Sequence, residues 1–353
     1  MEDSGKIFDT LILLVGTNPL PNFVVADYFI KNNPELNDIF LIYSEKTKTQ
    51  SGTKEYAENL QKLLQSHKER IPNFEFISLS DVSNAREIER DLDKGLKEKL
   101  KNKKHIHLNY TGGTKAMVIH VYRWIERYGL KNHIATSFSY LDARTFKIVD
   151  DKNGRITRDL RDHMSYSIQE LIKLHGFERI DNAQDNEIDR EKFEIFKKLI
   201  NSGEFEKYLE DNKGKVDGKL FEYYVYEVIR RNIKNIDIAI NWKIKRQNWH
   251  GENQKFEIDI FLVKGYQILG ISCTIARNKP LCKSKGFEIF MRTRQIGGDE
   301  SRAILITTLP ENKKIEIKQE LEVDTGGGEN ILVLGIEDLK EDILTHRIQE
   351  YIK

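Results

Sequence analysis

Apolar runs and polar segments alternate along the first 150 residues in a pattern that predicts strands separated by helices. The segment 9–16 is almost continuously apolar, which is typical of a parallel strand buried on both faces. Residues 54–67 instead carry apolar side chains at helical spacing. Further strands are predicted at 38–44, 73–78, 104–109, 133–141 and 146–150, and further helices at 23–30, 83–100 and from 115 onward. This repeated alternation predicts a Rossmann-like, mostly parallel α/β sheet. Pro21 is expected to delay the first helix until residue 23.

The second half of the chain predicts another α/β domain. Residues 150–186 are polar and charged, with a helical piece near 166–174, and two short helices are predicted within 187–209. A helix with an apolar face follows at 220–229. Strands are then predicted at 236–244, 256–263, 267–273, 303–307 and 331–334, and helices at 283–295, 312–321 and 336–352. We therefore divide the chain into a first domain at 1–155, a helical linker region at 156–212 and a second domain at 213–353.

Composition and charge narrow the functional classes. The chain of 353 residues has a formal net charge of +1, so any nucleic-acid binding must come from a local patch. Two cysteines nine residues apart predict neither a disulfide framework nor a zinc site. The sequence shows no signal peptide and no apolar run of membrane-spanning length, so a cytoplasmic protein without membrane contact is expected.

A glycine-rich turn, Asn-Tyr-Thr-Gly-Gly-Thr-Lys-Ala-Met at 109–117, lies between a predicted strand and a predicted helix. Gly112 and Gly113 let the backbone approach a ligand closely. Thr114 is positioned to cap the helix, which puts Lys115 in the first helical turn. A helix N-terminus beside a lysine suits an anion, and phosphate is the usual one. The spacing is not that of a P-loop, and no G-x-G-x-x-G motif follows the first strand.

Three polar loops follow predicted parallel strands, at 16–22, 44–49 and 110–115. In open α/β sheets, ligands bind beyond the carboxyl ends of the strands, where such loops meet. The loops therefore predict a ligand that carries phosphate. The plainer interpretation, that surface loops are simply polar, stays open.

Candidate chemistry in the second domain begins with carboxylates. Successive strand residues point to opposite faces, so Glu257 and Asp259 are expected to share one face, and Ser272 and Thr274 one face of the next strand. Glu222 lies near the start of the preceding helix. Carboxylates hold Mg²⁺ or Mn²⁺, and a lysine can stabilise a charged phosphorus centre. The order of these elements resembles the PD-(D/E)xK nuclease core, although Glu257 and Asp259 alone could be a solvated strand face.

The third strand departs from that nuclease pattern. An acid, a spacer and a lysine are expected where this chain has Ser272, Cys273 and Thr274. The following helix offers Lys285 and Glu288, three residues apart on one face, with Lys283 as a second candidate for the lysine. The backbone carbonyl of Cys273 is a further candidate metal ligand.

A basic segment supports contact with nucleic acid. Residues 277–294 hold six lysines and arginines against one glutamate, and Lys243, Lys245, Arg246 and Trp249 lie on the preceding strand region. Basic side chains with an aromatic ring suit phosphate contact and base stacking. A solvated charged surface would have the same composition.

Together, the segments 16–22 and 109–117 and the nuclease-like half resemble the CRISPR ancillary nucleases that join a CARF sensor domain to a PD-(D/E)xK-like domain. The resemblance covers nearly the whole chain, and Phe-Glu-Ile-Phe-Met-Arg-Thr-Arg-Gln-Ile-Gly-Gly at 287–298 also looks like the family's helix after the catalytic strands. It implies a Rossmann-like CARF domain followed by a restriction-endonuclease-like α/β domain. It further implies a homodimer activated by a cyclic oligoadenylate, commonly the tetra-adenylate, that cuts single-stranded DNA or RNA, or supercoiled DNA, with Mn²⁺ or Mg²⁺. Such a ring would match a twofold dimer.

Site residues follow from the motifs and this resemblance. The ligand site is assigned to Gly16, Thr17, Asn18, Pro19, Pro21, Asn22, Ser44, Thr111, Gly112, Gly113, Thr114, Lys115 and Met117. The catalytic residues are assigned as Glu222, Asp259, Ser272, Lys285 and Glu288, and the metal ligands as Glu222, Asp259 and Cys273.

Two alternatives stay open. One is a CARF sensor whose nuclease half has decayed into a regulatory or nucleic-acid-binding module, which the Ser-Cys-Thr sequence at 272–274 favours. The other is a small-molecule Rossmann enzyme, against which the missing dinucleotide motif weighs. Ring size, the choice between DNA and RNA, cleavage of the ligand by the sensor, and the choice between Lys283 and Lys285 are left undecided by the sequence.

Overall fold

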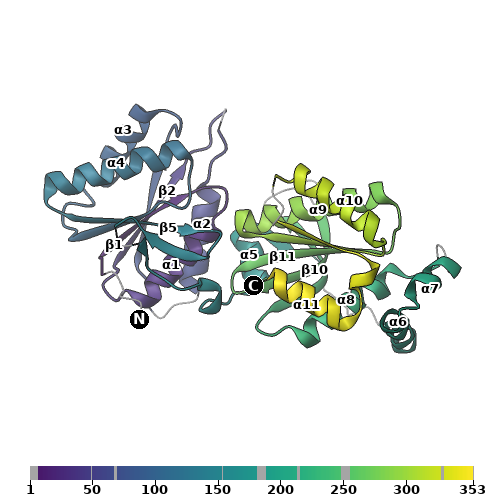
Figure 1. The fold of residues 1–353 in the computed structure, drawn as a ribbon. Coiled ribbons are helices and arrows are strands. Elements are labelled where there is room, and N and C mark those ends of the chain that lie inside the picture. Colours follow the sequence, from purple (N-terminus) through teal and green to yellow (C-terminus); the bar gives the residue numbers. More distant parts are fainter. Residues whose placement is uncertain are drawn as a thin grey trace. The chain divides into compact units, whose positions relative to one another are not determined.

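The computed structural model describes residues 7–48, 50–66, 70–152, 154–180, 188–212, 215–247, 255–326 and 330–352, which fold into two α/β units (Figure 1). The first unit comprises Met1–Met164 and Lys173–Gly176, and the second comprises Ser165–Ile172 and Phe177–Lys353. Two positions raised by the sequence, Thr49 and Trp249, lie outside the described residues.

The first unit contains a sheet whose described strands follow the order β3-β2-β1-β4-β5-β6-β7. The five strands from β3 to β5 are parallel, and β6 and β7 close the sheet in antiparallel fashion. Strand order therefore reverses between β1 and β4, which confirms the predicted Rossmann-like sheet. The strands are β1 (Thr10–Val15), β2 (Asp38–Ser44), β3 (Asn73–Leu79), β4 (His105–Asn109), β5 (Ala135–Asp142), β6 (Lys147–Asp150) and β7 (Gly154–Arg155).

Helices cover both faces of this sheet (Figure 1). Strand β1 is buried at every position, as its unbroken apolar run predicted. On one face, Ile12 and Leu14 belong to a core shared with α3 (Ala85–Leu96) and α4 (Lys115–Asn132). The other face is covered by α1 (Leu20–Asn32) and α2 (Lys54–Ser66).

The expected delay of the first helix by Pro21 is wrong. Helix α1 begins at Leu20, with Pro21 in its first turn. The first N–H groups of a helix have no partner within the helix, so a proline there loses no hydrogen bond, and its fixed φ already suits the helix. The helix consequently starts close to the end of β1, at the carboxyl edge of the sheet.

The second unit contains a mixed sheet whose described strands follow the order β13-β12-β11-β10-β9-β8. Strands β8 to β11 are antiparallel to their neighbours, whereas β11, β12 and β13 run parallel. The strands are β8 (Phe177–Arg179), β9 (Asp237–Arg246), β10 (Lys255–Lys264), β11 (Gln267–Thr274), β12 (Arg302–Thr307) and β13 (Ile331–Leu334). The three-residue β8 was not predicted, because so short a strand leaves no periodic signal.

Two helical layers enclose this sheet (Figure 1). Helices α8 (Gly218–Asn232) and α11 (Glu341–Tyr351) pack on one face, and α9 (Lys279–Gly297) and α10 (Glu311–Asp324) on the other. Helix α5 (Ile168–Leu174) lies in the segment that the sequence assigned to a linker, as do α6 (Arg190–Ser202) and α7 (Phe205–Asp211). Phe196 of α6 and Phe205 of α7 are buried in the core formed with α8, so both helices contribute packing to the second unit.

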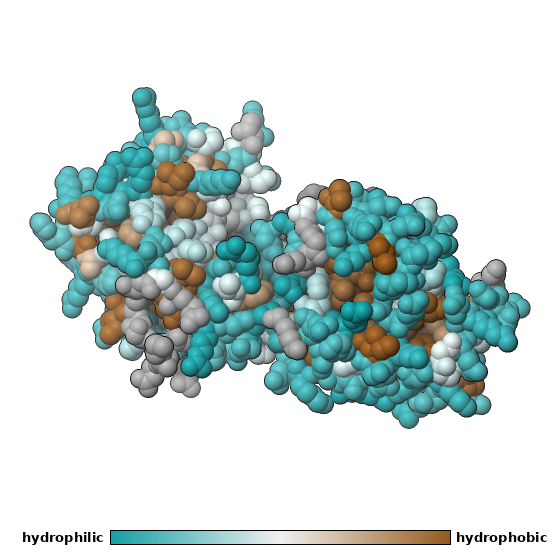
Figure 2. Space-filling view, in the orientation of Figure 1, coloured by the Kyte–Doolittle hydropathy of each residue, from teal (hydrophilic) through white to brown (hydrophobic). Residues whose placement is uncertain are grey.

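Among the described helices, none is both long and apolar enough to cross a membrane. The face drawn in Figure 2 is mostly hydrophilic, with small separate apolar patches.

Candidate ligand site and nuclease centre

The loops that follow β1 and β4 touch each other where the strand order of the first sheet reverses. A Cβ atom at Gly112 would lie 2.0 Å from the carbonyl oxygen of Leu14, and one at Gly16 would lie 3.1 Å from the amide nitrogen of Gly113. Gly113 itself has φ +81°, a conformation that side-chain-bearing residues rarely adopt. The glycines are therefore required by close backbone approach, and the two loops form one edge.

Buried side chains fasten these loops to the strand ends. Asn22 is fully buried and donates from Nδ2 to the carbonyl of Leu14 at 2.8 Å. The hydroxyl of Thr53 donates to the carbonyl of Val15 at 2.8 Å and accepts from the amide of Ser44 at 3.0 Å. Thr53 was not singled out in the sequence, because only the fold brings it to the end of β1.

A chain of polar groups along β4 and β5 ends in the glycine-rich turn. His107 is fully buried, with Nδ1 2.7 Å from the hydroxyl of Ser137 and Nε2 2.7 Å from that of Ser139. The hydroxyl of Ser139 accepts from Asn109 Nδ2 at 3.0 Å. Asn109 Oδ1 in turn accepts from the hydroxyl of Thr111 at 2.7 Å. The Thr111 hydroxyl also accepts from the amide of Leu141 at 2.7 Å, so it holds the turn in shape.

The residues assigned to the ligand site divide by exposure. Pro19, Pro21, Asn22, Ser44 and Met117 are buried, and the side chain of Met117 packs in the core of the first unit. The side chains of Thr17, Thr114 and Lys115 are exposed at this edge. Thr114 caps α4 by accepting from the amide of Met117 at 3.2 Å, as predicted.

A tyrosine pair beside the turn was missed by the sequence analysis. Tyr110 and Tyr122 both donate hydrogen bonds to the carboxylate of Asp151, at 2.6 and 3.0 Å. Burial, followed by this carboxylate, raises the pKa of Tyr122 to about 12 and that of Tyr110 further still. Both rings therefore stay neutral at ordinary pH and present polar and aromatic surface next to the loop 110–115.

Asp259 is held firmly in the second unit. Its Oδ2 accepts from the amide of Cys273 at 2.7 Å and from the hydroxyl of Ser272 at 3.0 Å. Burial raises the pKa of Asp259 above its ordinary value, and the hydrogen bond from Cys273 and the charge of Lys285 offset only part of this effect. Such an environment is typical of a functional carboxylate.

Glu222 of α8 completes a carboxylate pair with Asp259. Burial raises the pKa of Glu222 to about 7, and the charges of Asp259 and Glu257 add to the effect, whereas Lys285 and Asn241 oppose it. Two neighbouring carboxylates therefore act on a third, buried one, and such a place favours a cation. Burial also raises the pKa of the Cys273 thiol, so this thiol is neutral and is no thiolate ligand.

The strands β9 and β10 are irregular at Asp259. Their pairing runs through Ile258 with Trp242 and resumes at Ile260 with Ile240, and the intervening Asn241 has φ +54°. Ile260 packs in the core with α8, whereas the ring of Phe256 lies under the guanidinium of Arg292 from α9. The simple alternation expected from Phe256 to Ile260 is therefore interrupted at Asp259, where one residue of each strand is left out of the pairing and the register stays unchanged. Asn241 was missed, because nothing in the sequence marks this kink.

Lys285, and not Lys283, lies at the carboxylates. The charge of Lys285 lowers the pKa values of both Glu222 and Asp259. Lys283 instead forms ion pairs of 2.9 Å with Glu320 and with Asp324 of α10. Two helical residues that are two positions apart point about 200° away from each other, so only one of them can face the sheet edge. Glu288 is exposed, acts on the pKa of Asp259 and lies 3.8 Å from Arg292.

The predicted basic patch is largely neutralised by acidic partners. Arg277 pairs with Glu206 and Glu210 of α7, Lys279 pairs with Glu316 and Glu320, and Arg294 pairs with Asp299. Lys243 lies 3.7 Å from Glu257, and Lys245 lies 3.0 Å from Glu178. Ion pairs of this kind reduce the field that the segment offers to a polyanion.

The donor set at Asp259 suits a hard divalent cation. No group of three His, Cys, Asp or Glu side chains placed to hold a metal occurs within the described ranges. Mg²⁺ commonly takes only one or two carboxylates and keeps several waters, so Glu222, Asp259 and a backbone carbonyl are sufficient ligands.

The fold and these residues define a two-unit α/β protein with a polar, glycine-rich loop edge in one unit and a carboxylate–lysine cluster in the other. Residues 10–155 match the family model of the Card1 CARF domain, so this part of the chain is a CARF domain. No curated protein matches the sequence.

Solved structures share the fold at low sequence identity. The protein VC1899 from Vibrio cholerae is 14% identical with a TM-score of 0.68, covering 97% of this chain and 98% of its own. Can2 from Sulfobacillus thermosulfidooxidans, in complex with cyclic tetra-adenylate, is 16% identical with a TM-score of 0.64, covering 98% and 99%. A type III CRISPR defence DNA nuclease activated by cyclic oligoadenylate is 14% identical with a TM-score of 0.54, and the match covers 87% of this chain and 47% of that protein. These likenesses extend over both units and confirm the fold class.

Proposed function

We propose that this protein is a nuclease of type III CRISPR antiviral defence that is activated by a cyclic oligoadenylate and depends on a divalent metal. The CARF domain at 10–155 supports the sensing half of the proposal. The observation that carries the catalytic half is the approach of Glu222, Asp259 and Lys285 from three different elements to one irregular point of the second sheet.

Glu222, Asp259 and the carbonyl of Cys273 would hold Mn²⁺ or Mg²⁺. When bound, this cation supplies an activated water and stabilises negative charge at phosphorus. Ser272 and the Cys273 amide fix the orientation of Asp259 through the two hydrogen bonds to Oδ2. The third strand lacks a lysine, and Lys285 of α9 provides the cation for the charged phosphorus centre in its place. Glu288 lies one turn further along α9.

The proposed activator is cyclic tetra-adenylate, bound at the edge formed by the loops after β1, β2 and β4. Likeness to Can2, which was solved with this ligand, supports the choice. Exposed Lys115, the neighbouring hydroxyl of Thr114 and the first N–H groups of α4 are suited to phosphates. A homodimer would present these loops twice to a twofold ring, and the ring would activate by favouring one of two dimer arrangements.

A second candidate is a CARF sensor whose nuclease half is inactive and serves regulation or nucleic-acid binding. The specific observation in its favour is Ser272, a neutral residue at the position of the third-strand acid, hydrogen-bonded to Asp259. The two functions differ in turnover and in the need for metal.

Cleavage of defined substrates separates the two candidates. Purified protein is incubated with single-stranded DNA, single-stranded RNA and supercoiled plasmid, with Mn²⁺ or Mg²⁺, and with each cyclic oligoadenylate in turn. The nuclease proposal expects cleavage that needs both activator and metal and that disappears in EDTA and in Asp259→Asn. Cleavage that survives EDTA or Asp259→Asn would contradict the assigned centre, and binding without cleavage under every condition would favour the sensor.

A further inference from the structure

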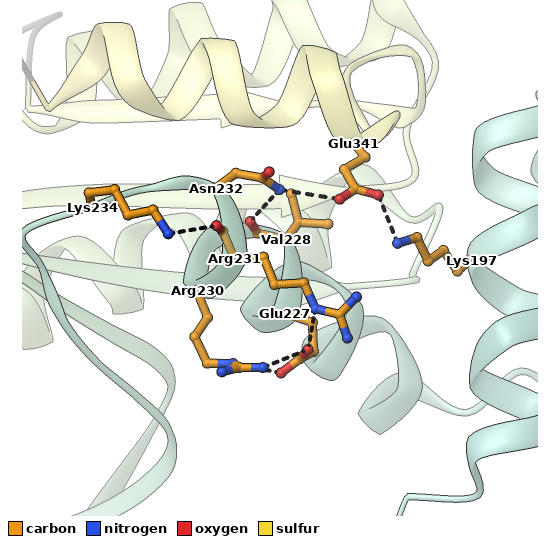
Figure 3. Close-up of polar contacts among 8 residues, drawn as sticks. All are labelled: Lys197, Glu227, Val228, Arg230, Arg231, Asn232, Lys234 and Glu341. Atoms are coloured by element: carbon orange, nitrogen blue, oxygen red, sulfur yellow. Dashed lines mark hydrogen bonds and ion pairs between the residues drawn. The ribbon is translucent and has the colours of Figure 1, made fainter.

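The end of α8 carries two arginines that one buried carboxylate holds in position (Figure 3). Glu227 accepts hydrogen bonds from Arg230 Nε at 2.8 Å and Nη2 at 3.0 Å, and from Arg231 Nε at 2.8 Å. The side chain of Glu227 is 7% exposed, whereas those of Arg230 and Arg231 are 48% and 50% exposed. The carboxylate is thus an interior anchor, and the guanidinium groups are at the surface.

Both guanidinium groups keep donors for an external partner. Each has five N–H donors in a planar fork, and the hydrogen bonds to Glu227 use two from Arg230 and one from Arg231. In the part of the chain that the structure describes, neither guanidinium makes another hydrogen bond. Because the forks are already oriented, less side-chain entropy is lost when they bind a phosphate.

The surroundings of this pair are positive. Lys234 lies beside Arg231, donating to its carbonyl at 3.4 Å, and Lys197 pairs with Glu341 at 2.9 Å. The Glu341 carboxylate also accepts from Asn232 at 3.2 Å. The residues drawn in Figure 3 therefore include four cations and two carboxylates, both of which are engaged within the cluster.

The cluster lies on the helix that supplies Glu222. Glu222, Tyr226 and Arg230 are spaced four residues apart and therefore follow one another along one face of α8. Arg230 is eight residues from Glu222, about 12 Å along the helix axis. The half-buried ring of Tyr226 lies between them, with the ring centroid of Tyr223 at 6.1 Å. The carboxylate of Glu222, the ring of Tyr226 and the oriented guanidinium of Arg230 follow in this order, which suits the binding of a single nucleic-acid strand along the helix.

We propose that Arg230 and Arg231 form a phosphate-binding exosite that holds a strand of the nucleic-acid substrate a few nucleotides from the catalytic centre. This inference rests on the proposed nuclease function. It also explains how the second unit could bind a polyanion although the basic residues of the segment 277–294 are largely ion-paired. The opposing structural interpretation is that both arginines only stabilise the C-terminus of α8 through its dipole.

Equilibrium binding tests the exosite without relying on cleavage. In the Asp259→Asn background, the affinity for a fluorescently labelled single-stranded DNA of about 20 nucleotides is measured between 50 and 200 mM salt, with and without cyclic tetra-adenylate. Arg230→Gln/Arg231→Gln should weaken binding about tenfold or more and reduce the salt slope by about one to two units. Arg90→Gln/Arg127→Gln, which removes two exposed, ion-paired arginines from the first unit, is the matched control.

The outcomes are distinct for the exosite and for the nuclease. Equal affinity and equal salt slope in the two double variants would overturn the exosite. It would also be overturned if the protein with both arginines intact had no affinity for the DNA strand. Arg230→Lys/Arg231→Lys, which keeps the charge, should recover most of the salt slope and so separates charge from misfolding. If binding depends on the two arginines but the wild-type protein cleaves no substrate, the nuclease proposal is refuted and the exosite is retained.

Discussion

The hydroxyl of Ser272 donates a hydrogen bond of 3.0 Å to Oδ2 of Asp259, so a neutral side chain orients the carboxylate at the point where a second acid would repel it. The amide of Cys273 binds the same oxygen at 2.7 Å. Oδ2 of Asp259 is thereby fixed by two donors, whereas no hydrogen bond to Oδ1 occurs among the residues that the structure describes.

Replacing Ser272 tests whether this hydrogen bond orients Asp259. Ser272→Ala should lower the free energy of unfolding by about 0.5–1.5 kcal/mol, the usual net value of one hydrogen bond. The single-turnover cleavage rate should fall more than substrate affinity, because the amide of Cys273 still holds the carboxylate but less firmly. Chemical denaturation and single-turnover kinetics measure the two effects. An unchanged rate would mean that the amide alone is sufficient.

Replacing the lysines of α9 one at a time tests the catalytic cation. Lys285→Ala should lower the single-turnover rate at saturating substrate about 100-fold or more, with affinity nearly unchanged. Lys283→Ala is the matched control, since Lys283 pairs with Glu320 and Asp324 and should leave the rate intact. If Lys285→Ala lowers only the affinity for substrate and reduces the salt slope by about one unit, Lys285 binds the phosphate backbone of the substrate instead.

The carboxylate of Glu222 should be needed for cleavage while it lowers the stability of the folded, metal-free protein. Its pKa is raised from an ordinary value of 4.5 to about 7, so the metal-free protein loses stability as the pH rises from about 4.5 to about 7, and the full loss is present above that. Glu222→Gln in EDTA should therefore melt at a higher temperature than wild type at pH 8, and the difference should vanish below about pH 4.5, where the carboxyl is protonated in both states. The same variant should be inactive with Mn²⁺. A lower melting temperature at pH 8 would contradict the raised pKa.

The polar chain that ends at Thr111 should control ligand affinity indirectly. Thr111→Val removes the hydrogen bonds to Asn109 and from Leu141, and it should lower the melting temperature and weaken cyclic tetra-adenylate binding about tenfold. Thr111→Ser keeps the hydroxyl and is the control that should bind normally. Calorimetric titration provides the affinities. Normal affinity in Thr111→Val would show that the turn keeps its shape without this chain.

Much of the fold follows from local patterns. The strand boundaries at 38–44 and 331–334 agree with the prediction, because each apolar run is bounded by polar or turn-forming residues. The meeting of the loops after β1 and β4 was also predictable, since the carboxyl ends of parallel strands lie at one edge of the sheet. The three-residue β8 and the first turn of α1 were not predicted, because neither carries a periodic signal of its own.

The details of both sites depend on contacts that are distant in sequence. The basic segment 277–294 is largely neutralised by Glu206 and Glu210 of α7, which pair with Arg277, and by acids of α10, which no local pattern reveals. The left-handed conformation of Asn241 occurs where the pairing of β9 with β10 is interrupted. The hydroxyl of Thr111 looks available in the sequence but is engaged by Asn109 and Leu141 in the fold.

The activation curve tests the central claim, that a cyclic oligoadenylate bound at the CARF edge switches on a nuclease. Single-turnover cleavage with Mn²⁺ is followed against cyclic tetra-adenylate concentration for wild type, Lys115→Ala and the control Lys131→Ala, an exposed lysine in the last turn of the same helix. The account predicts no cleavage without ligand, a midpoint about 10- to 100-fold higher in Lys115→Ala with the same maximal rate, and an unchanged midpoint in Lys131→Ala. Full cleavage without any cyclic oligoadenylate, or one midpoint shared by all three proteins, would contradict it.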